Sequence, residues 1–255
     1  MKPAILLVGI LTLGIPASAQ TRIEKTIPVK AGQMLSMDFE FPELIRVQTW
    51  DKNEILIKGE VSINKGEDDD AFELVIDQSG NEINVSSVLK DKENIPHRLV
   101  IKVGDTEYFF KAKDANDPEV QKFLEDHGRQ YAYMSNGIIK EITLEIFVPE
   151  GMETSVESKF GLVEVKNFQA PLKVSSKFGG VDASIVERST GELTARTEFG
   201  EILTNLDVKF DSEKNIPDSH HHDRLTVVSA KPGTGPRYEF ESKFGKVYLR
   251  KADQN

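Results

Sequence analysis

The segment VSSKFGGVDA (174–183) has three further copies in the C-terminal half of the chain. They are VESKFGLVEV (156–165), ARTEFGEILT (195–204) and FESKFGKVYL (240–249). Every copy carries Phe-Gly at the same offset, and successive Phe residues lie 18, 21 and 45 positions apart. Self-similarity at a period of about 20 residues is typical of stacked architectures in which each repeat is one supersecondary unit. The motif therefore predicts the fold more directly than it predicts a function.

Within each copy, the apolar positions change phase at the Phe-Gly pair. Side chains of a strand alternate between two faces, so the Phe points the same way as the residues two and four positions before it. After the glycine, the apolar positions fall three and five residues beyond the Phe. Glycine at a change of phase is typical of a bulge or corner, because it tolerates unusual φ and close backbone approach. Each copy therefore predicts a strand, a glycine corner and a second strand.

Repetition of this unit predicts an all-β fold, namely a β-solenoid or β-helix-like stack with single-stranded rungs and one short helical insertion. The Phe side chains are expected to form an internal ladder beside a row of Ser and Thr. The alternative is that the aromatic row is an exposed binding platform. The repeat residues are Phe160, Gly161, Phe178, Gly179, Phe199, Gly200, Phe244 and Gly245.

Residues 20–255 are predicted to form a single β-solenoid domain with insertions at about 91–137 and 207–224. The first insertion contains the one credible helix, with Asp117 as N-cap, Pro118 at the first helical position and Gly128 as the stop. The second insertion lengthens the last Phe-to-Phe spacing to 45. Both insertions are expected to leave the strand framework intact.

Residues 1–19 have the pattern of a secretory signal. Lys2 precedes an apolar run from Ala4 to Ile15, and the A-x-A pattern 17–19 comes directly before Gln20. The chain has no cysteine, so neither a disulfide nor a lipid-modified N-terminal cysteine is available. We therefore expect a soluble exported protein, periplasmic or secreted, that is not lipid-anchored and does not insert in a membrane after signal cleavage.

The formal net charge of the chain is −10 at pH 7. A surplus of carboxylates disfavours binding to nucleic acid and to anionic membrane surfaces. The net charge does not indicate what the protein does bind. The sequence contains no fingerprint of a cofactor site. The expected partners are therefore an unknown protein or glycan at the cell envelope.

Two longer segments carry a resemblance to a known family. They are FPELIRVQTWDKNEILIKGEV (41–61) and VPEGMETSVESKFGLVEV (148–165), the second leading into the Phe-Gly units. With the signal-like N-terminus, they resemble the bacterial putative-adhesin family, an exported β-solenoid domain of unknown function of the Bacteroidetes type. The resemblance implies a stacked β fold and an interaction at the cell surface or in the periplasm. It implies no catalytic residues.

A histidine-rich segment is the strongest candidate for metal chemistry. Imidazole and carboxylate groups bind Zn²⁺, Ni²⁺ or Cu²⁺, but adjacent residues of an extended chain point to opposite faces. His220 and His222 are therefore the pair that can converge, with Asp218 nearby. The alternative is a solvated loop, since the surrounding residues lack apolar periodicity. The expectation is no resident cofactor, with weak divalent metal binding at this cluster as the open alternative.

The acidic run 67–70 suggests oxygen ligands for Ca²⁺, but it lacks the spaced pattern and the glycine of a calcium loop. A solvated turn is the favoured interpretation of this run. The carboxylates elsewhere are spread evenly along the chain and form no catalytic pair in the sequence. We therefore expect the chain not to be an enzyme.

The predicted function is that of a non-catalytic exported protein, adhesin-like, that presents a β-solenoid surface for contact with protein or glycan. The alternative is a carbohydrate-active enzyme on a β-helix scaffold, which exposed aromatic residues beside paired acids would favour. The aromatic candidates are Trp50, Tyr108, Phe109, Phe110, Tyr131 and Tyr133.

Overall fold

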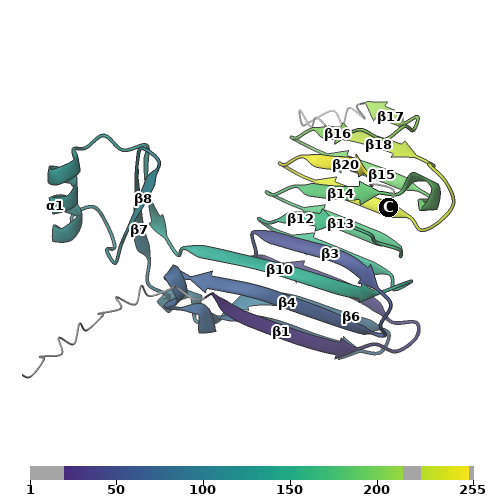
Figure 1. Ribbon diagram of the computed structural model, residues 1–255, viewed down its shortest axis with the longest axis horizontal. Coiled ribbons are helices and arrows are strands. Elements are labelled where there is room, and N and C mark those ends of the chain that lie inside the picture. Colours follow the sequence, from purple (N-terminus) through teal and green to yellow (C-terminus); the bar gives the residue numbers. More distant parts are fainter. Residues whose placement is uncertain (1–19, 215–224, 253–255) are drawn as a thin grey trace, which may run out of the picture.

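The computed structural model describes residues 20–214 and 225–252. Two large mixed sheets face each other over one core, and a small third sheet with the α-helix projects from one end of them (Figure 1). The predicted signal segment, residues 1–19, lies outside the described residues. Within the described ranges, no helix has the length and apolar composition needed to cross a bilayer.

The first large sheet has 8 strands in the order β1-β4-β10-β3-β12-β14-β20-β16. Its strands are β1 (Thr21–Pro28), β3 (Leu44–Trp50), β4 (Glu54–Ile63), β10 (Lys140–Pro149), β12 (Leu162–Val165), β14 (Val181–Ile185), β16 (Ile202–Thr204) and β20 (Val247–Lys251).

The second large sheet has 9 strands in the order β17-β18-β15-β19-β13-β11-β2-β6-β5. Its strands are β2 (Met34–Phe39), β5 (Phe72–Ser79), β6 (Glu82–Leu89), β11 (Thr154–Ser158), β13 (Leu172–Ser176), β15 (Leu193–Thr197), β17 (Asp211–Lys214), β18 (Thr226–Ala230) and β19 (Tyr238–Ser242).

Each copy of the repeated motif contributes one strand to each large sheet. The strand before the Phe lies in the 9-stranded sheet, and the strand after the glycine lies in the 8-stranded sheet. Parallel pairing keeps the copies in register, so that Val174 lies between Val156 and Phe240. The change of phase at the glycine is therefore the point where the chain passes from one sheet to the other.

The all-β expectation is confirmed, but the predicted solenoid stack is wrong. The copies of the motif pair in parallel, yet both large sheets also contain antiparallel pairs, β1 with β4 and β4 with β10 in one, β5 with β6 and β15 with β18 in the other. A solenoid winds in one direction through successive rungs, whereas these strands reverse direction at both ends. The fold is thus a pair of mixed sheets.

The order of the strands also departs from the order of the sequence. Strand β19 lies between β13 and β15, and β20 lies between β14 and β16. The last copy of the motif is therefore inserted between the second and the third. Regular spacing along a chain does not fix this order, because parallel strands of similar sequence compete for the same neighbours.

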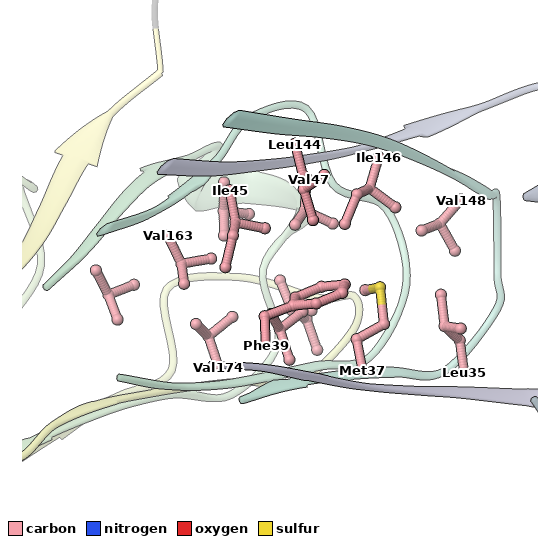
Figure 2. Close-up of a cluster of buried hydrophobic side chains, with 14 of the residues drawn as sticks. Leu35, Met37, Phe39, Ile45, Val47, Leu144, Ile146, Val148, Val163 and Val174 are labelled. Atoms are coloured by element: carbon pink, nitrogen blue, oxygen red, sulfur yellow. The ribbon is translucent and has the colours of Figure 1, made fainter. Parts of the chain in front are cut away.

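The core fills the space between the two large sheets. Figure 2 shows Leu144 and Ile146 of β10 facing Met37 and Phe39 of β2, with Val174 of β13 alongside. All five side chains are at most 1% exposed. Full burial of such a side chain contributes about 1.5–3 kcal/mol, so this alternation of apolar residues is the main source of stability.

The segment that leaves the two large sheets folds around a small core of its own. Strands β7 (Arg98–Val103), β8 (Thr106–Phe110) and β9 (Tyr133–Gly137) form a sheet in the order β8-β7-β9, and α1 (Pro118–His127) packs on one face of it. The helix begins as predicted, because the Asp117 carboxylate accepts a hydrogen bond from the Glu119 N–H at 2.9 Å. It ends at Gly128, whose φ is 76°.

The remaining short elements are 3₁₀ turns. They are η1 (Asn64–Gly66), η2 (Asp69–Ala71), η3 (Lys92–Asn94) and η4 (Glu187–Ser189). Of the predicted insertion 207–224, the described part adds β17 to the edge of the 9-stranded sheet. Residues 215–224 lie outside the described residues.

Candidate functional site

The four Phe side chains of the motif are exposed, so the prediction of an internal ladder is wrong. Between 45% and 53% of each side chain is accessible to solvent, in Phe160, Phe178, Phe199 and Phe244. The strand before each Phe ends two residues earlier, at the Ser or Thr. The alternation of faces stops there, and the turn that follows directs the ring outward.

Hydrogen bonds from the Ser and Thr row hold these turns in place. The Ser242 hydroxyl accepts from the Gly245 N–H at 2.9 Å and donates to the Gly179 carbonyl at 3.0 Å. Ser158 and Thr197 accept in the same way from the glycine three residues later. The whole row is buried, and each hydroxyl bonds to backbone groups of the turns that are buried or partly buried.

Substitution of Ser242 by Ala is expected to lower the free energy of unfolding by about 1–3 kcal/mol, because it leaves the partly buried Gly245 N–H and Gly179 carbonyl without this partner. Urea unfolding measures the effect. The control is Ser175→Ala, since Ser175 is on the outward side of β13. Equal stability of the two variants would show that the hydroxyl row does not hold the turns.

The glycines of the motif permit close approach of one turn to the next. A Cβ on Gly245 would lie 1.6 Å from the Gly179 carbonyl oxygen, and one on Gly179 would lie 2.2 Å from the Gly161 carbonyl oxygen. None of the four motif glycines has φ in the left-handed region. Of the two reasons predicted for glycine here, close backbone approach is therefore the one that applies.

The four rings stack face to face in one line, which we call the Phe ladder. Its order is Phe160, Phe178, Phe244 and Phe199, and the centroid distances are 5.4, 5.2 and 5.0 Å. The interplanar angles are 15°, 7° and 8°. Neighbouring rings therefore cover one another's faces, and the ladder presents ring edges, which carry partial positive charge.

Lysines flank the Phe ladder. The ammonium groups of Lys159, Lys177 and Lys243 lie 5.2–5.8 Å from the centroid of the following Phe ring. The equivalent position in the remaining copy is Glu198, which forms an ion pair with Lys243 at 2.8 Å. The ladder is thus an apolar strip bordered by three lysines and Glu198.

An acidic residue closes the Phe160 end of the strip. Glu40, in the turn between β2 and β3, accepts a hydrogen bond from Lys159 at 2.8 Å. This hydrogen bond lowers the pKa of Glu40. Glu40 therefore remains ionised near neutral pH and holds Lys159 beside the ladder.

A fifth, divergent copy of the motif, not predicted from the sequence, lies in this same turn. Strand β2 pairs with β11 so that Phe39 lies opposite Ser158, and β3 pairs with β12. The next ring, Phe41, is buried, and the Lys92 ammonium lies 5.2 Å from its centroid. The change of phase of the apolar positions at FPE (41–43) could have revealed this copy, but Pro42 stands where the other copies have glycine.

The Phe ladder lies on the side of the sheets that faces the small sheet. Each turn precedes one of the strands β12, β14, β16 and β20, which all run parallel to β3 and β10. Strand β10 enters the large sheet directly after β9, so the beginnings of these strands point toward α1 and β7 (Figure 1).

The aromatic candidates of the first insertion separate into two groups. Tyr108 and Phe110 pack against Phe123 of α1, with ring centroids 4.6 and 5.1 Å apart. The exposed members are Phe109, Tyr131 and Tyr133, each 40–41% accessible. Trp50 is partly buried in the large sheet, where its indole N–H donates to the Glu54 carbonyl at 2.7 Å.

The metal candidates Asp218, His220 and His222 lie outside the described residues. The acidic run 67–70 has structural partners, because the Asp69 carboxylate accepts from the Ile63 N–H at 2.6 Å and Glu67 pairs with Arg98 at 2.9 Å. Across the described ranges, no group of three His, Cys, Asp or Glu side chains is arranged to hold a metal ion.

Comparison with solved structures finds two matches of low sequence identity. One is a putative cell adhesion protein from Clostridium sporogenes, with 9% identity, a TM-score of 0.42, and 91% of this chain and 99% of that chain covered. The other is a putative adhesin from Bacteroides fragilis, with 12% identity, a TM-score of 0.22, and 92% and 98% covered.

No family model matches the chain, and no curated protein matches it.

Proposed function

We propose that this chain is an exported, adhesin-like binding protein without catalytic activity, and that the Phe ladder is its binding surface. The observation that carries the proposal is the row of four half-exposed rings held in line by buried hydroxyls and close-packed glycines. Contiguous apolar surface that a stable framework keeps in water is typical of an interaction site. The signal-like residues 1–19 and the family resemblance support export.

The geometry of the rings favours a protein partner over a glycan. Sugars stack on the faces of aromatic rings, whereas the two inner rings of the Phe ladder, Phe178 and Phe244, each have a stacked neighbour on both sides. Ring edges instead pack against aliphatic side chains and against the faces of aromatic side chains, in edge-to-face contacts. Such contacts are made by the apolar side chains of another polypeptide.

The charged groups beside the ladder support binding without catalysis. The carboxylate of Glu198, beside the ladder, forms an ion pair with Lys243. The ammonium groups lie 5.2–5.8 Å from the ring centroids, and Lys159 pairs with Glu40. These groups suit attraction of a partner with acidic and apolar surface.

The test is a binding assay of the purified protein against immobilised extracellular-matrix proteins and immobilised glycans. Phe178→Ser with Phe244→Ser removes the two central rings and is expected to weaken binding to a protein ligand at least tenfold, as loss of central aromatic contacts does. The matched control is Phe109→Ser, an exposed Phe outside the ladder. Binding only to glycans, no binding at all, or equal binding by the double variant would contradict the proposal.

A further inference from the structure

A groove of about 400 Å³ lies between the small sheet and the beginning of β10. The small sheet contributes Phe109, Tyr133 and Glu107, β10 contributes Glu141, and the turn before β3 contributes Glu43. It therefore brings exposed aromatic side chains together with carboxylates from three separate parts of the chain. The Phe ladder does not line it.

Alternation along the small sheet explains why these aromatic residues are available. Leu99, Ile101 and Phe110 point to the face that α1 covers, and they are buried there. Phe109 and Tyr133 have the opposite parity and are each 40% exposed. Neither ring stacks on another aromatic ring in the described part of the chain, in contrast to the rings of the Phe ladder.

The register of the small sheet sets the distance between the two rings. Phe109 lies opposite Val100, and Tyr133 lies opposite Lys102, so β7 separates them. Adjacent strands are about 4.8 Å apart, which places the backbones of β8 and β9 about 10 Å apart. A ligand that touches both rings must therefore be longer than a single small ring.

Contacts within the protein hold the polar groups of the groove in position. The Tyr133 hydroxyl donates to the Glu107 carboxylate. Lys65 pairs with Glu141 at 3.0 Å, and its ammonium lies 4.1 Å from the centroid of the Phe109 ring. These interactions reduce the ordering that a ligand would otherwise have to impose.

The charge and shape of the groove select the class of ligand. Its three carboxylates, Glu43, Glu107 and Glu141, are matched in number by the cations Arg98, Lys140 and Lys65, so the groove has no excess of positive charge to select phosphate, sulfate or nucleic acid. Burial, together with the charge of Glu141, raises the pKa of Glu43, which disfavours a further negative charge there. The groove is open, whereas small apolar ligands are bound in sites that bury most of their surface.

We propose that this groove binds a neutral oligosaccharide that spans Phe109 and Tyr133. The C–H faces of the sugar rings would pack on Tyr133 and on the face of Phe109 that Lys65 does not cover, and the hydroxyl groups would donate to the carboxylates. This proposal does not depend on the function proposed for the Phe ladder. The two surfaces are made by different residues and take ligands of different chemistry.

Calorimetric titration of the purified protein with cellohexaose, laminarihexaose, maltohexaose and N-acetylchitohexaose tests the proposal. We expect saturable binding of at least one of them, weakened at least tenfold in Phe109→Ala with Tyr133→Ala. Phe178→Ser with Phe244→Ser is expected to keep the wild-type affinity for the saccharide. Unchanged melting temperatures would show that the groove variant is folded, since both of its residues are exposed.

Three outcomes of the titrations with wild type and the groove variant would overturn the saccharide site. They are no saturable binding of any of the four hexasaccharides at millimolar concentration, equal binding by the folded groove variant, and binding of heparin hexasaccharide in place of the neutral ones. Loss of saccharide binding in the ladder variant alone would assign the sugar to the Phe ladder and would also overturn it.

Discussion

Gly245→Val is expected to lower the free energy of unfolding by about 3 kcal/mol, the upper end of what overpacking usually costs. A Cβ at this position would lie 1.6 Å from the Gly179 carbonyl oxygen and 2.8 Å from the Ser242 hydroxyl oxygen. Both atoms belong to the hydrogen-bonded turns, so neither moves without breaking contacts along the ladder. The shift of the urea midpoint measures the effect.

Gly137→Val is the matched control for this substitution. Gly137 lies in β9 with no atom within 4 Å of the position that a Cβ would take, and its φ is not in the left-handed region. It is expected to stay within about 0.5 kcal/mol of wild type, as surface substitutions usually do. A Gly245 variant as stable as the Gly137 variant would contradict the close packing of the turns.

Phe240→Ala is expected to destabilise the protein by about 3–5 kcal/mol, whereas Phe244→Ala is expected to cost about 1 kcal/mol. The two residues belong to the same copy of the motif and are four positions apart. Phe240 is 1% exposed in the core, and Phe244 is 45% exposed in the ladder. Truncation of Phe240 leaves a cavity, while truncation of Phe244 removes only contacts between stacked rings.

Chemical unfolding of the two variants under identical conditions gives the comparison. Similar losses of stability in both, or a larger loss in Phe244→Ala, would show that the motif ring is buried and that the outward direction of the ladder is wrong.

The sequence was sufficient to place most of the core side chains of the motif. The apolar residue four positions before each Phe and the Ser or Thr two positions before it are buried, as alternation predicts. The inference failed at the Phe itself, because it extended the alternation beyond the end of the strand. Phe178 lies two residues after the last residue of β13, Ser176, in a turn whose direction is set by hydrogen bonds.

The order and direction of the strands were harder to predict from the sequence. Alternation of apolar and polar residues has the same period in parallel and antiparallel strands, so it did not reveal that β4 and β10 are antiparallel. The spacing of 45 between Phe199 and Phe244 was compatible with successive rungs, but the last ring lies between Phe178 and Phe199. A hydrogen bond between the third and the last copies agrees with this order, because the Thr197 hydroxyl donates to the Gly245 carbonyl.

The groove between the small sheet and β10 was also only partly predictable from the sequence. Phe109 and Tyr133 were recognised as candidates, and the caps of α1 were predicted correctly from Asp117 and Gly128. Their neighbours Glu43 and Glu141 come from distant parts of the chain, and only the folded arrangement brings them to one groove. Local sequence patterns do not indicate which residues distant in the sequence will line the same groove.

Hydroxyl-radical footprinting with mass spectrometry tests most directly whether the Phe ladder is an exposed binding surface. In the free protein, Phe160, Phe178, Phe199 and Phe244 should be oxidised much faster than the buried Phe240. When a protein ligand from the binding assay is added, the ladder should become protected while Phe109 remains reactive. Ladder rings as unreactive as Phe240 in the free protein, or equally reactive with and without the ligand, would contradict the account.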